Sequence, residues 1–114
     1  MKYALLIYND VWARDLPEDQ REAVIGEYDA IFRAPGVLDG IALEEAHSAT
    51  TVRAADGGAL LSDGPFVDAK EYLGGLFVLE ADNLDAATAF AQRIPAVRLG
   101  GAVEVRPIRE LPPR

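Results

Sequence analysis

Two segments of the chain are apolar on both faces of the strand that each would form. In Lys2–Tyr8 the apolar side chains of Leu5 and Leu6 point to opposite sides, because successive residues of a strand face opposite ways. The segment Leu73–Ala81 repeats the pattern in its run LFVL. A strand of this kind needs an apolar layer on either side of its sheet. This requirement restricts the folds open to the chain more than any other feature of the sequence.

Helical periodicity supplies one such layer. The first predicted helix is capped by Asp15, has Pro17 in its first turn, and ends before Pro35 and Gly36. Its predicted apolar stripe consists of Val24, Ile25, Tyr28, Ile31 and Phe32. The second helix is capped by Asp82 or Asn83 and stops at Pro95. Its predicted stripe consists of Leu84, Ala87, Ala91 and Ile94, with Phe90 beside them.

The remaining elements complete a symmetric order. Val37–Glu44 and Ala102–Ile108 read as strands, and a hairpin joins Thr50–Arg53 to Ala59–Ser62 through the turn Asp56–Gly58. The order is β-α-β, an inserted β-hairpin, then β-α-β, which predicts an α+β, ferredoxin-like fold in a single domain over residues 1–114. Two helices shield only one face of the sheet. We therefore expect a homodimer, in which a second copy covers the other face.

Composition narrows the function classes. The formal net charge is −8, which disfavours nucleic acid and anionic membranes as partners. There is no cysteine, so thiol catalysis and thiolate metal sites are excluded. The apolar run at the N-terminus is too short for a signal peptide or a membrane span, and we expect a cytoplasmic protein. No phosphate loop or dinucleotide fingerprint occurs, and we expect no cofactor and no metal.

The segment DGPFVDAKEYLGG, residues 63–75, resembles the signature of the DGPF branch of the YCII-related superfamily. The resemblance extends over nearly the whole chain, and it implies a dimeric fold of the dimeric α/β-barrel type. It also implies a possible sigma-factor-linked signalling context and partner. Some YCII-related proteins carry a His–Asp pair with the histidine on the first helix. The first helix of this chain has no histidine, so that pair is not transferred.

Several residues are candidates for function. Asp63 and His47 are the candidate catalytic groups: the first is in the DGPF turn and the second lies in a loop beside two glutamates. The candidate ligand-binding residues are Tyr8, Asp10, Phe66, Lys70 and Glu71. Asn9 stands between Tyr8 and Asp10 in a polar cluster after the first strand.

Each candidate also has a structural interpretation. The Asp63 carboxylate would close the turn by accepting a backbone N–H, and Phe66 would pack on the core. Lys70 and Glu71 would point to opposite faces of a strand as surface charges. Gly74 and Gly75 indicate a bulge or a close backbone approach, to a ligand or to a neighbouring subunit.

Two functional hypotheses remain open, beside a purely structural role in which the motif maintains the dimer. The first is a dimer of uncertain activity that binds a small molecule or a protein partner. The alternative is a cofactor-independent enzyme with acid–base residues in a cleft between subunits, using Asp63 together with Tyr8, Asp10 or His47. Whether the protein is an enzyme at all stays undecided at this level.

Overall fold

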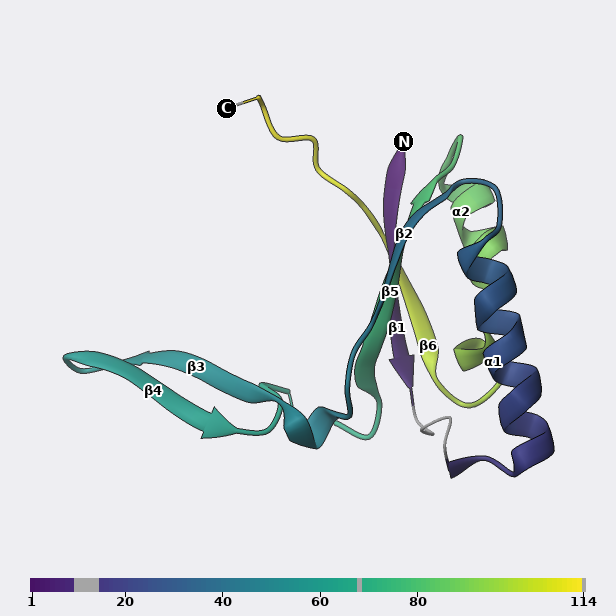
Figure 1. Ribbon diagram of the computed structural model, residues 1–114. Helices are drawn as coiled ribbons and strands as arrows, with labels where there is room; N and C mark the ends of the chain where they lie inside the picture. Colours follow the sequence, from purple (N-terminus) through teal and green to yellow (C-terminus); the bar gives the residue numbers. More distant parts are fainter. Residues whose placement is uncertain (10–14, 68, 114) are drawn as a thin grey trace.

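The computed structural model describes residues 1–9, 15–67 and 69–113, and these form a sheet with helices on one face (Figure 1). The sheet has the order β2-β5-β1-β6 and every pairing in it is antiparallel. Its strands are β1 (Lys2–Asn9), β2 (Val37–Ala42), β5 (Tyr72–Glu80) and β6 (Ala102–Pro107). The helices are α1 (Glu18–Phe32) and α2 (Leu84–Ala91). The predicted mixed α+β fold with two helices is confirmed.

The core lies between the sheet and the helices. Leu5 of β1 is completely buried, and Phe77 and Leu79 of β5 lie beside it on the same face. Ala87 and Ala91 are the small residues that let α2 approach this face closely. Ile94, which follows α2, is 1% exposed and closes the core beside it.

The two helix starts differ in how they are capped. Asn83 is extended and its side-chain oxygen accepts the N–H of Ala86 at 2.8 Å, so it is the cap of α2. The expectation that Asp15 caps α1 is wrong. Pro17 is the residue that precedes the first helical turn, and no side chain caps that helix. Glu18 and Asp19 in the first turn supply the negative charge that favours this end of the helix dipole.

The predicted apolar stripe of α1 is only partly buried. Val24 and Ile31 are buried, whereas Ile25 and Phe32 are 56% and 53% exposed. The Phe32 ring meets Phe77 edge to face, with centroids 6.5 Å apart. The rest of the Phe32 side chain borders a space between α1 and the sheet. This space exists because part of the helix is not packed against the strands.

β3 (Thr50–Ala55) and β4 (Gly58–Asp63) form a separate two-stranded sheet. This hairpin and the C-terminal segment both extend from the side of the main sheet that faces away from the helices (Figure 1). Apart from Thr51, every residue of the two strands is exposed. The pairing is regular along its whole length, from Thr50 opposite Asp63 to Ala55 opposite Gly58.

The face of the main sheet opposite the helices, called the open face here, is apolar along its middle. It presents Ala4, Leu6, Tyr8, Ile41, Leu76 and Val78, with Glu104 and Arg106 at the β6 edge. The chain exposes 8081 Å², against roughly 6,100 Å² for a compact monomer of this mass. Its radius of gyration is 16.2 Å, against about 13 Å for a compact domain of this length. The molecule is thus a slab with an uncovered apolar side.

No helix among the described residues is both long and apolar enough to cross a membrane.

Replacing the α2 cap tests the assignment at the start of that helix. Asn83→Ala removes the acceptor of the Ala86 N–H, and we expect the free energy of unfolding to fall by about 1 kcal/mol. Asp82→Ala is the matched control, since Asp82 is an exposed neighbour outside the helix, and its effect should stay within about 0.5 kcal/mol. Urea unfolding measures both. Equal losses from the two variants would contradict the assignment of Asn83 as the cap.

Candidate functional site

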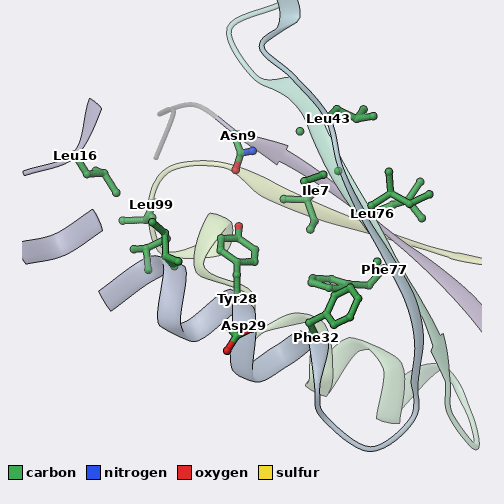
Figure 2. A pocket seen from close by; sticks show the side chains of 17 residues that line it. Ile7, Asn9, Leu16, Tyr28, Asp29, Phe32, Leu43, Leu76, Phe77 and Leu99 are labelled. Carbon is green, nitrogen blue, oxygen red and sulfur yellow. The ribbon is translucent and has the colours of Figure 1, made fainter. Parts of the chain in front are cut away.

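A cavity of about 480 Å³ lies between α1 and the sheet, and it is called the α1 cavity here. Figure 2 shows it between the helix and the strands, with side chains from both walls pointing into it. The helix wall includes Val24, Ile25, Tyr28 and Phe32, and the helix-facing side of the sheet contributes Ile7, Gly40 and Phe77. Leu16 and Leu99 line the end of the cavity near the start of α1. The lining is mostly apolar, which is typical of small-molecule sites.

Three polar side chains belong to the described lining of this cavity. Tyr28 from α1 and Asn9 from the end of β1 point into it from opposite walls (Figure 2). Asp29 lies at its margin, exposed, and pairs with Arg33 one turn later at 3.4 Å. No lysine, arginine or histidine is among the described lining residues. Hydrogen-bond donors and acceptors are therefore available to a bound molecule, but no positive charge is.

Tyr28 has a perturbed acidity. Burial of the phenol raises its pKa above the usual value of 10.0. A hydrogen bond with the backbone of Ala96 and the nearby charge of Arg98 act in the opposite direction, and burial outweighs them. Tyr28 is consequently a neutral phenol at physiological pH and retains its proton for donation to a ligand.

Gly74 and Gly75 shape the sheet wall of the cavity. The pairing of β1 with β5 shifts between Ile7 and Tyr8, which leaves Gly74 as the extra residue of a bulge. A Cβ on Gly74 would collide with the Asn9 amide, and a Cβ on Gly75 would collide with the backbone oxygen of Ile41. The close backbone approach expected at Gly74 and Gly75 is thus between neighbouring strands of this chain. Gly74 leaves room for the Asn9 side chain.

A second hollow of about 600 Å³ lies at the base of the hairpin and is called the hairpin cleft here. Three candidate ligand-binding residues, Tyr8, Phe66 and Glu71, are part of its lining. Leu43, Tyr72 and Leu73 also line it. Tyr8 belongs to the open face, so this cleft lies on the opposite side of the sheet from the α1 cavity.

The candidate catalytic residues are not brought into either hollow. Asp63 ends β4 and is exposed, and His47 is exposed with its Nδ1 3.0 Å from Glu45 Oε2. Neither they nor Lys70 are among the described lining residues of the α1 cavity or the hairpin cleft. Asp10 lies outside the described residues. No group of three His, Asp or Glu side chains suited to a metal occurs in the described ranges.

The expectation that Phe66 packs on the core is wrong. Its side chain is 70% exposed, and the Arg53 guanidinium lies 5.3 Å from the ring centroid. The turn is held through the backbone of Gly64 instead: the Gly64 N–H donates to Ala49 O at 2.7 Å, and the side-chain hydroxyl of Thr51 donates to Gly64 O at 2.8 Å. These bonds tie the segment to the base of the hairpin, away from the helix-covered face where the core lies.

The sequence placed Asn9 and Tyr8 in one polar cluster. In the structure Asn9 lines the α1 cavity and Tyr8 lines the hairpin cleft, on opposite faces of the sheet. On sequence alone, Tyr28 also counted as an ordinary member of the apolar stripe. The available signal was the phenol itself, because a tyrosine in an otherwise aliphatic stripe places a polar tip beside apolar surface.

Comparisons with known proteins agree with this architecture. The family model of the YCII-related domain matches residues 1–112. An uncharacterized protein of Rhizobium meliloti (strain 1021), R00369, is 34% identical over 118 residues, which cover 95% of this chain and 92% of that protein.

A solved structure gives a similar fold. It is the 5-chloro-2-hydroxyhydroquinone dehydrochlorinase TftG from Burkholderia phenoliruptrix AC1100, in complex with 2,5-dihydroxybenzoquinone. The TM-score is 0.50 at 16% identity, and the match covers 96% of this chain and 94% of that one. At this identity the likeness concerns the fold alone.

The raised pKa of Tyr28 predicts a pH effect on stability. The folded chain holds the phenol proton more tightly than the unfolded chain does, in which tyrosine titrates near about pH 10. The resulting stabilisation is complete below that pH and is lost as pH rises through the folded pKa. Above about pH 10, the wild type should therefore lose more free energy of unfolding than Tyr28→Phe. Urea unfolding measures this, and parallel curves for the two proteins would contradict the burial of the phenol.

Proposed function

The chain belongs to the YCII-related domain family, and on that premise we propose that it binds a small, uncharged, ring-sized molecule in the α1 cavity. The observation that carries the proposal is the cavity itself, with its apolar walls and the neutral Tyr28 phenol directed into it. A volume of about 480 Å³ lies within the range of small-molecule sites.

The polar groups favour a particular kind of ligand. Tyr28 donates a hydrogen bond to an oxygen or nitrogen acceptor, and the Asn9 amide both donates and accepts. Transfer of a carboxylate into this space is costly because the described lining supplies no cation and includes Asp29. A neutral ring compound that carries a carbonyl, amide or hydroxyl group suits these constraints. The TftG structure contains a ring compound with oxygen substituents, and such compounds are suitable first probes.

Benzamide and benzoate form a matched pair of probes, since they have the same size and differ in charge. We expect isothermal titration to detect benzamide binding at millimolar or lower concentration, and benzoate to bind at least about tenfold more weakly. Tyr28→Phe should weaken benzamide binding about tenfold, because the ligand oxygen loses its donor. Tyr3→Phe is the control, since Tyr3 is buried outside the described cavity lining. Benzoate binding as tightly as benzamide, or unchanged binding to Tyr28→Phe, would contradict the proposal.

We propose in addition that the protein is a homodimer whose copies stack through their open faces. Leu6, Leu76 and Val78 form an apolar surface on the side that no helix covers. The chain exposes 8081 Å², about 2,000 Å² more than a compact monomer of its mass. A standard dimer interface removes about 800 Å² from each partner, so the excess on one chain is more than such an interface requires.

A charge on the open face tests the dimer. Val78→Asp should convert the dimer to monomers at micromolar concentration, because it places a carboxylate in the centre of the stacked sheets. Leu84→Asp is the control, because Leu84 is 52% exposed on α2 and lies on the other side of the sheet. Analytical ultracentrifugation measures the mass. A monomeric wild type would overturn the dimer outright.

Residues 63–75 support placement of the chain in the DGPF branch of the family. The sigma-factor-linked partner and the cytoplasmic location remain expectations from that branch and from composition. The alternative acid–base chemistry would need Asp63 or His47 to face a second copy, since neither lines a hollow formed by the described residues of one chain.

A further inference from the structure

We propose that the hairpin of β3 and β4 is a clasp that grips a second copy of this chain, through one defined face of the hairpin. The proposal rests on the homodimer proposed above and adds a second contact surface, separate from the stacked sheets. The occupant of this surface is the partner subunit.

One face of the hairpin is apolar and the other is mixed. Val52 lies directly opposite Leu61, and Ala54 lies opposite Ala59, so these four side chains share one face, and only the rung of Thr50 and Asp63 at the base of the hairpin is polar on that face. Val52 and Leu61 are 64% and 65% exposed. On the reverse face Leu60 lies opposite Arg53, with Thr51 opposite Ser62. The face with Val52 and Leu61, called the clasp face here, is the one suited to protein contact.

The hairpin is long enough to reach past a stacked partner sheet. Each of its strands has six residues, which extend about 20 Å at 3.3 Å per residue. Stacked sheets lie about 10 Å apart. The hairpin projects on the open-face side of the main sheet (Figure 1), where the second copy lies in the proposed dimer. Roughly half of its length is then beyond the gap between the sheets and lies along the partner.

The hairpin also lacks support from its own chain. β3 and β4 contact chiefly each other. An isolated two-stranded hairpin is marginally stable in water, yet this one is paired regularly over all six rungs. Contact of the clasp face with a second copy removes Val52 and Leu61 from water. It also gives the hairpin an apolar surface to pack against, which its own chain does not provide. Because a two-fold dimer repeats each contact, both clasps contribute equally.

Two adjacent leucines give a matched test. Leu61→Asp places a charge on the clasp face, and Leu60→Asp places the same charge on the reverse face, 52% exposed. We expect Leu61→Asp to weaken dimerisation by at least about tenfold, measured by analytical ultracentrifugation, and Leu60→Asp to change it by less than about threefold. Circular dichroism of each variant checks that the main sheet and helices still fold.

Thiol labelling gives an independent measurement, because the chain has no cysteine of its own. The thiol of Leu61→Cys should react several-fold more slowly with a maleimide above the dimerisation concentration than below it. The thiol of Leu60→Cys should react at the same rate in both conditions. The clasp is overturned if the two aspartate variants dimerise with equal affinity and the two cysteine variants, as intact dimers, are labelled at equal rates. The proposed dimer through stacked sheets would still stand in that case. A wild type that stays monomeric would overturn both.

Discussion

Burial of a sheet that is apolar on both faces is the constraint on which the rest of the structure depends. Leu5 and Leu6 are neighbours in β1, and one is fully buried under the helices while the other lies on the open face. The helices α1 and α2 cannot cover both sides, since both lie on one (Figure 1). The flat slab, the large exposed area and the proposed dimer all follow from this imbalance.

The same shortage of cover produces the α1 cavity. α1 buries Val24 and Ile31 but leaves Ile25 and Phe32 partly open, so the helix stands away from the strands along part of its length. Gly74 and Asn9 shape the opposite wall, and Tyr28 supplies a partly buried, neutral phenol. A ligand site in this position needs no added loop, because the space arises from incomplete packing between one helix and one sheet.

Several features were predictable from local sequence, and others were not. The Asn83 cap was one of two residues anticipated at the start of α2, and its extended backbone lets it accept the Ala86 N–H. The position of Phe66 was not predictable, because an aromatic residue after a turn packs wherever the chain is directed. Here Gly64, with a φ of 96°, and its hydrogen bonds fix the turn at the base of the hairpin. That Tyr8 and Asn9 face opposite sides of β1 follows from strand alternation, but which of the two faces the helices was decided by packing.

The sequence by itself determined the order of the elements, the two-sided apolar strands and the shortage of helical cover, because each depends on periodicity and on turn residues a few positions apart. Only the tertiary structure decided which face the helices cover, where α1 stands off the sheet, and which polar groups enter the space beneath it. Those outcomes depend on contacts between segments distant in sequence, such as Tyr28 with Ala96 and Gly74 with Asn9, whose partners no local pattern specifies.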